Sequence, residues 1–206
     1  MKKALRGLSG IQLFEIIKNT ETEYEVEATS VRLPYAQTMT RDVQSSSDPV
    51  YADDEIYDDE EVLEGEDMEL TIPEVSLDLL PIVEGGSYDA NTKEYSFGGN
   101  NGKNYAMTFK SKMKNGCYRM FRYYNVKFKK AKQDLQTLDN GTQIASVVIT
   151  LTAYRRALIE TGEAFPKLRT LKDTTLETQE EDLKWLNTVP KVSPVETSGD
   201  EGNGEG

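Results

Sequence analysis

The chain has 206 residues, with 24 Lys or Arg against 36 Asp or Glu, and carries a formal net charge of −12. It contains no histidine and one cysteine, Cys117. Without histidine the chain lacks the commonest general base, the commonest metal ligand and every Ser/His or Cys/His dyad, and a single cysteine cannot form a cysteine-based zinc site. We therefore expect no enzyme, no metal and no other cofactor in a chain long enough for one ordinary core.

The compartment follows from the same residues. A lone Cys117 cannot form an intramolecular disulfide, which is typical of a protein made in a reducing cytosol. Residues 1–10 contain no apolar signal region, and the longest apolar runs fall far short of the roughly 20 residues that span a membrane. We expect a product without a cleaved signal or a membrane anchor.

The charge is segregated along the chain. Residues 42–74 hold fourteen acids and no Lys or Arg, whereas residues 103–132 hold ten bases and no acid. Either these are two solvated surfaces, or they are complementary faces that favour head-to-tail association between copies. Charge alone favours the first interpretation.

The N-terminal third predicts strands. Residues 11–18 and 24–33 are expected to form two antiparallel strands joined by a polar turn at 19–23. Residues 40–65 combine most of the acids with little apolar content and are expected to form a long, exposed loop. Apolar and polar residues alternate over 68–72, which predicts another strand.

The middle of the chain begins with a short helix over residues 79–84, capped by Asp78, followed by a strand over 88–97. Strands over 105–113 and 117–128 are joined at Asn115-Gly116, a strong hairpin signal. In the second of them we expect one inward face and one opposite face that carries Phe121 and Tyr123; the inward residues are Tyr118, Met120, Tyr124, Val126 and Phe128. Residues 143–153 form the last clear strand.

Beyond Arg156 the pattern indicates an arm. Thr178 and Glu181 form a capping-box pattern that predicts a short helix near 179–186, ending before Pro190. The domain organisation is therefore a β domain over 1–156, with the long loop 40–65, and a C-terminal arm over 157–206 that ends in a flexible acidic tail.

Two patterns hint at a binding site. The acidic run 53–61 lacks the spacing of a calcium loop, and we interpret it as a solvated loop. The basic strands near Tyr118, Phe121, Tyr123 and Tyr124 have the composition of a single-stranded nucleic-acid platform, but the same alternation is typical of a half-buried strand. The second interpretation is favoured, and a monomeric β-barrel nucleic-acid-binding module using residues 103–132 is the alternative.

The order of these elements resembles the major tail protein, or tail tube protein, of long-tailed phages that infect Gram-positive bacteria. The resemblance covers Leu5 to Arg156. Three pieces carry it, and each is identified by its place in the order: Tyr51-Ala52-Asp53-Asp54, the pairing of Met68-Glu69-Leu70-Thr71-Ile72 with Leu77-Asp78-Leu79-Leu80, and Gly116-Cys117-Tyr118-Arg119 leading to Tyr124-Asn125-Val126-Lys127-Phe128.

The resemblance implies a mainly β, two-sheet sandwich or barrel-like fold with a short flanking helix. It implies a structural virion protein, made in the bacterial host cytoplasm, whose copies form hexameric rings that stack into the tail tube, the conduit for the genome. The implied partners are other copies of itself, a tape measure protein, a terminator and distal tail proteins. Phage DNA would pass through without specific binding, because an acidic lumen repels phosphates.

Candidate residues follow for two surfaces. We expect Asp67, Glu69 and Thr71 to face the lumen, because they form the polar side of the strand 68–72; facing solvent or a neighbouring subunit is an equal alternative. For the subunit interface we expect a match of opposite charge between the acidic segment and a set of lysines, namely Asp53, Asp54, Glu55, Asp58 and Asp59 against Lys110, Lys112, Lys127 and Lys129.

Overall fold

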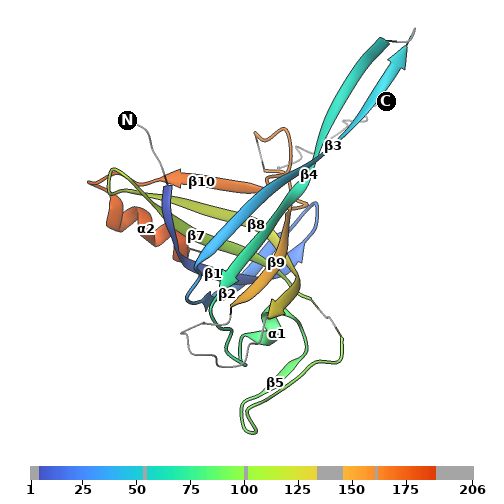
Figure 1. The fold of residues 1–206 in the computed structure, drawn as a ribbon. Helices are drawn as coiled ribbons and strands as arrows, with labels where there is room; N and C mark the ends of the chain where they lie inside the picture. The colour runs from blue at the N-terminus through green and yellow to red at the C-terminus, as the bar shows by residue number, and fades with distance from the viewer. Residues whose placement is uncertain (1–4, 53–54, 100–101, 134–145, 161, 189–206) are drawn as a thin grey trace, which may run out of the picture.

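The computed structural model describes residues 5–52, 55–99, 102–133, 146–160 and 162–188, with the backbone alone at 47–52, 55–62, 130 and 133. Antiparallel strands dominate the fold, and two short helices accompany them (Figure 1). The elements in chain order are β1 (Leu5–Asn19), β2 (Tyr24–Leu33), β3 (Thr38–Ala52), β4 (Glu55–Ile72), α1 (Leu80–Val83), β5 (Ser87–Asp89), β6 (Glu94–Ser96), β7 (Asn104–Met113), β8 (Tyr118–Gln133), β9 (Val147–Tyr154), β10 (Arg169–Asp173) and α2 (Gln179–Asn187).

The main sheet has eight strands in the order β2-β1-β7-β8-β9-β4-β3, and β10 joins it at β8. Strand β8 is the point where the sheet forks. One of its edges pairs with β7, while the other pairs with β10 over 119–123 and with β9 over 125–133. Over the described residues the sheet does not close into a barrel.

The sheet curls around one main core. Each strand from β1 to β9 in the large sheet, except β3, contributes fully buried apolar side chains, and α1 adds Leu79 and Val83 beside them. A second cluster lies on the outer face of β1, β2, β7 and β8, and Leu158 joins Phe14 and Tyr124 in it. The predicted mainly β class with a short flanking helix is confirmed.

The expected loop over 40–65 is wrong. Of these, residues 40–52 and 55–65 belong to β3 and β4, which pair antiparallel from Thr38↔Thr71 to Ala52↔Glu55. Main-chain hydrogen bonds hold this hairpin, and they form regardless of side-chain polarity, so the acidic composition hid two strands.

The expected faces of β8 are also partly wrong. Phe121 and Tyr123 share the main core with Val126 and Phe128, whereas Tyr124 lies in the outer cluster. The cause is a bulge: β7 advances two residues from Tyr105 to Met107 while β8 advances three. One extra residue in a strand turns every later side chain to the opposite face.

Three smaller expectations also change. Asp78 does not cap α1, whose N-cap is Leu79 without a side-chain hydrogen bond, although Pro81 does lie in the first turn. Residues 88–97 form the hairpin β5–β6 instead of one strand, because Asp89 accepts a hydrogen bond from the backbone of Asn91 and starts a turn. Thr178 is the N-cap of α2 but makes no side-chain capping bond.

The segment after Arg156 returns to the sheet within the described residues. Leu158 is buried in the outer cluster, β10 pairs with β8, and α2 packs on the outer face of β7 and β8. There Thr108 donates to the carbonyl of Leu186, and Arg122 stacks on Trp185 while donating to its carbonyl. The helix α2 lies where the sequence predicts one; the division of the chain at residue 156 stays a prediction.

Candidate assembly surfaces

The most prominent surface feature is a two-stranded arm. Strand β4 pairs with β9 only over Glu66–Ile72, so among the described strands residues 55–65 pair with β3 alone. From here on, the arm means residues 44–52 and 55–65, and not the C-terminal arm predicted over 157–206. Figure 1 shows it projecting well beyond the rest of the sheet. An isolated two-stranded hairpin is marginally stable in water. The arm therefore has much to gain from a second surface.

A buried ion cluster anchors the base of the arm. The side chain of Glu66 is 1% exposed and accepts a hydrogen bond of 2.9 Å from the Tyr123 hydroxyl. Arg41 Nη1 lies 3.5 Å from Glu66 Oε1, and Arg169 Nη1 forms an ion pair with Glu66 Oε2. These four residues come from β3, β4, β8 and β10, so the cluster joins the arm to both branches of the fork.

Charge in this cluster is unbalanced, with one carboxylate facing two guanidinium groups. Burial lowers the pKa of Arg169, and the nearby charge of Arg41 lowers it further. Burial raises the pKa of Tyr123, so its hydroxyl keeps its proton and can donate to Glu66. The excess positive charge sits on side chains that are about one-third exposed, 33% for Arg41 and 30% for Arg169.

Close backbone approach fixes the angle at which the arm leaves the sheet. A Cβ atom on Gly65 would lie 2.6 Å from the carbonyl oxygen of Ala153 in β9. The β3–β4 register also shifts between Gln44 and Ser45, opposite Gly65 and Leu63. A bulge and a glycine together bend the ribbon here, which is their usual function in a strand.

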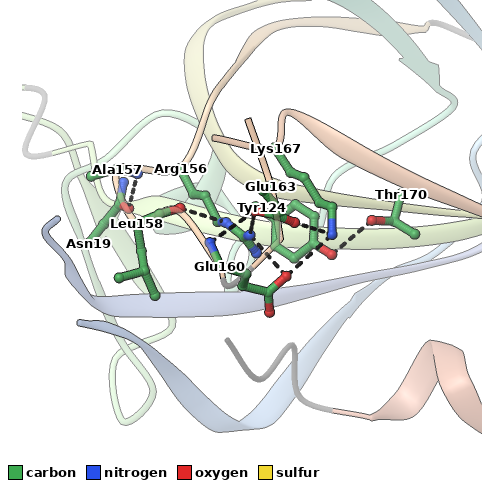
Figure 2. A network of polar contacts seen from close by, with 9 residues as sticks. All are labelled: Asn19, Tyr124, Arg156, Ala157, Leu158, Glu160, Glu163, Lys167 and Thr170. Atoms are coloured by element: carbon green, nitrogen blue, oxygen red, sulfur yellow. Dashed lines mark hydrogen bonds and ion pairs between the residues drawn. The ribbon is translucent and has the colours of Figure 1, made fainter. Parts of the chain in front are cut away.

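A second buried cluster holds residues 156–160 and 162–168 against the outer face (Figure 2). The side chain of Arg156 is fully buried; it pairs with Glu160 at 3.0 Å and Glu163 at 2.5 Å and lies over the Tyr124 ring. Lys167 pairs with the same two carboxylates. Two bases thus face two acids.

Electrostatics favour the charged form of Glu163. Burial alone would raise the pKa of Glu163, but hydrogen bonds from Lys167, the backbone of Glu160 and Arg156 outweigh it and lower the pKa to about 2. The pKa of Lys167 is raised, first by its hydrogen bond to Glu163. Both partners therefore stay ionised at neutral pH, and the charges of the two bases and two acids balance within the cluster.

The predicted lumen residues lie on the polar face of β4. Asp67, Glu69 and Thr71 alternate with the buried Met68, Leu70 and Ile72. Asp67 accepts a hydrogen bond from Thr152 and pairs with Lys129 at 3.3 Å, and the Thr152 hydrogen bond is the main cause that lowers the pKa of Asp67. That these residues face a lumen stays a prediction.

The predicted interface lysines do not form one patch. Lys112 pairs in register with Tyr118 at one end of β8, whereas Lys127 and Lys129 lie at the other end, about 30 Å away along the strand. Lys129 is engaged with Asp67, and Lys110 lies over the Tyr118 ring at 4.7 Å. The match with the acidic segment stays a prediction.

Their expected acidic partners lie on the arm. Asp53 and Asp54 fall outside the described residues, and Glu55, Asp58 and Asp59 belong to the part of β4 described by its backbone alone. The backbone places these three residues on the outer portion of the arm, paired with β3. They are therefore carried away from the lysines of the same chain.

The sequence did not reveal a cleft between β1 and β3. It has a volume of about 340 Å³. Among the described residues that line it, Arg41 is the charged one. The remaining lining residues are Leu5, Gly7, Leu8, Gln37, Thr38, Met39, Phe109, Ser111 and Phe121. Gly7 and Gly10, both with positive φ, offer the only sequence hint, since they mark the irregular β1–β7 register beside it.

The aromatic residues of the alternative nucleic-acid platform are mostly covered. Phe121, Tyr123 and Tyr124 are 2%, 0% and 7% exposed. Bases stack only on rings that present a free face, so these three rings offer no platform in this structure.

Comparisons with known proteins identify no family. A scan against protein-family models gives no match, and a search of the curated proteins gives none. Among solved structures, the chain is similar to one in the cryo-EM structure of the anti-feeding prophage (AFP) baseplate, six-fold symmetrised, with a TM-score of 0.41 and 5% identity over 84% of this chain and 97% of that chain.

Two further observations concern other classes of site. Among the described residues, no group of three or more His, Cys, Asp or Glu side chains is arranged to hold a metal ion. None of the helices in the described part of the chain is long and apolar enough to cross a membrane.

Proposed function

We propose that this protein is a non-enzymatic structural component of a phage virion, whose copies form stacked, six-membered rings that make the tail tube. The arm is the observation that carries the proposal. A ribbon of nine residue pairs projects from the body, and no other described strand of the chain pairs with it. A protein that works alone gains nothing from such an exposed hairpin, whereas an assembling subunit uses it to reach its neighbour.

The open edges of the sheet support the same proposal. Among the described strands, β2 pairs only with β1, and β3 pairs only with β4, so both ends of the sheet present unpaired main-chain groups. Different edges on one chain suit head-to-tail contacts, and such contacts generate a closed ring when the rotation between copies closes.

The charge distribution suits a conduit for DNA. The chain carries −12 overall, and the polar face of β4 presents Asp67 and Glu69. An acidic channel repels phosphates and lets a duplex pass, whereas a basic channel would retain it through counterion release. The proposed partners are other copies of the chain, with tape measure, terminator and distal tail proteins at the ends of the tube.

Negative-stain electron microscopy of the purified chain over a concentration series tests this function. Hollow rings or tubes with a central channel are the expected result, together with no salt-dependent binding of a short oligonucleotide. Small particles at every concentration, in the presence of a preformed tail tip as nucleus, would overturn the proposal.

A further inference from the structure

The cleft between β1 and β3 has the chemistry of a binding site that is complete except for one carboxylate. We propose that it receives the acidic arm of a second copy of this chain, with Arg41 as the residue that pairs with an incoming carboxylate. This inference rests on the proposed function and names the contact through which one copy holds the next.

The first argument is the charge balance beside the cleft. Glu66 supplies one negative charge, and Arg41 and Arg169 supply two positive charges, both partly open to solvent. Arg41 uses Nη1 for its contacts with both Glu66 and the Tyr123 hydroxyl. Its Nε and Nη2 groups make no hydrogen bond to a described residue, and a guanidinium offers five N–H donors in a planar fork. One more carboxylate would neutralise the cluster.

The second argument is the apolar floor. Arg41 lies over the Phe121 ring at 4.9 Å from its centroid, and Phe109 stacks against Phe121. Leu5 and Leu8 border the cleft from β1, and Met39 borders it from β3. An occupant therefore needs an apolar side chain next to an acid.

The third argument is the free backbone on both sides. Strand β1 pairs with β2 only from Ile11 onward, so over Leu5 to Gly10 its only partner among the described strands is β7. The outer edge of β3 has no strand partner among the described residues. An extended segment entering the cleft therefore meets unpaired N–H and C=O groups, which is how strands add to a sheet edge.

The arm has the sequence that these three features require. Residues 55–61 read Glu-Ile-Tyr-Asp-Asp-Glu-Glu, which places two large apolar side chains among five acids in an extended strand. The arm of the same chain leaves the sheet directly beyond Arg41, and residues 55–58 lie about 30 Å farther along the ribbon. It points away from its own cleft, so the occupant is the arm of another copy.

A crosslinking experiment on the full chain tests the contact. A photoreactive phenylalanine analogue replaces Leu8 in the cleft, or Val148 on the opposite face of the sheet as the matched control. In a mixture of isotopically light and heavy protein, irradiation is expected to join residue 8 of one copy to residues 55–62 of another. Crosslinks between copies that join residue 8 only to segments other than the arm would overturn the proposal, as would equal crosslinking of the arm to residue 148.

Charge variants measure the energetic side. Arg41→Gln is expected to weaken self-association about tenfold or more, because it removes a charge-assisted hydrogen bond. The matched control is Lys114→Gln, an exposed cation next to the β7–β8 turn and outside the cleft, which should leave association within about twofold. Since Arg41→Gln also takes a partner from Glu66, the arm variant D58N/D59N/E60Q/E61Q tests the same contact without altering the cleft. Unchanged association in this variant would overturn the proposal.

The outcomes separate the two proposals. Rings or tubes that form without any crosslink between cleft and arm overturn this contact and leave the tail tube function standing. Crosslinked chains of copies that never close into rings or tubes support the contact and overturn the tube. Particles that remain monomeric at every concentration overturn both.

Discussion

The two buried ion clusters of this protein differ in charge balance: one is neutral, and the other has an excess of positive charge. The Arg156 cluster has two bases and two acids, all within residues 156–167. The Glu66 cluster has one acid and two bases, drawn from β3, β4 and β10. The first is local and neutral; the second joins distant parts of the chain and carries excess positive charge.

This difference assigns distinct functions to the two clusters. A balanced, buried cluster gives a partner nothing to bind, so the Arg156 cluster acts by holding residues 156–168 on the sheet. An unbalanced cluster at the rim of a cleft keeps a guanidinium exposed, and it does so where the arm begins. We expect substitutions in the first to change stability alone and substitutions in the second to change both the arm and association.

The largest effect is expected at Arg156. Arg156→Gln leaves Glu160 and Glu163 with Lys167 as their remaining cation, although Glu163 is only 11% exposed. Removing one partner from a buried ion pair costs about 3–4 kcal/mol. Urea unfolding of the purified variant measures this loss.

The control for this prediction is an exposed ion pair. Lys184 and Glu181 lie 2.7 Å apart at 71% and 76% exposure, so Lys184→Gln should change the free energy of unfolding by less than about 0.5 kcal/mol. Equal losses of unfolding free energy in Arg156→Gln and Lys184→Gln would contradict the prediction that the buried ion pairs contribute more to stability than the exposed one.

A smaller effect is expected at Glu66. Glu66→Gln leaves Arg41 and Arg169 facing each other without a carboxylate, at a cost of about 2–3 kcal/mol because both guanidiniums can still reach water. Hydrogen exchange should also accelerate in the backbone amides of the arm, since its base is no longer pinned. The exposed Glu69→Gln on the same strand is the control, and an arm that exchanges equally fast in both variants would contradict the anchor.

The glycine at the base of the arm should give a milder loss. Gly65→Ala places a Cβ 2.6 Å from the carbonyl oxygen of Ala153, and relieving that clash costs about 1–2 kcal/mol. Gly98→Ala has open space around the added atom and serves as the control. Thermal unfolding of both variants checks the difference. An unchanged melting temperature for Gly65→Ala would show that β4 and β9 can move apart at residue 65 without loss of stability.

Side-chain periodicity made much of the fold predictable. Residues 11–18 are apolar on both faces, the strands at 24–33 and 68–72 alternate, and Asn115-Gly116 marks the β7–β8 hairpin, so all of these elements could be predicted from local pattern. The arm could not, because its strands are held by main-chain pairing and carry acids that are typical of a loop. The bulge in β8 was hidden for a similar reason: both of its faces are apolar, so the pattern does not show where the phase changes.

The candidate surfaces were less predictable than the fold. Glu66 lies within a run of acids, and nothing in the sequence distinguishes it from its exposed neighbours Glu64 and Glu69. Its partners come from residues 25 before it to 103 after it, and only the forked sheet brings them together. The candidate interface lysines show the opposite case, because Lys112 and Lys127 are close in the sequence but lie toward opposite ends of the β7–β8 pairing.

The smallest effect is a pH dependence that distinguishes the two clusters. The pKa of Glu163 is lowered from 4.5 to about 2, so its contribution to stability is present above pH 4.5 and is lost as the pH falls toward 2. At a pH of roughly 3.5 the loss relative to neutral pH is about 1 kcal/mol. Glu163→Gln has no such titration, so the gap in unfolding free energy between wild type and variant should narrow by that amount between pH 7 and pH 3.5. A constant gap would show that Glu163 is not held ionised by Lys167 and Arg156. A narrowing gap accompanied by faster exchange at Leu158, with the arm unchanged, would show that acid releases the segment 156–168 while the Glu66 cluster still anchors the arm.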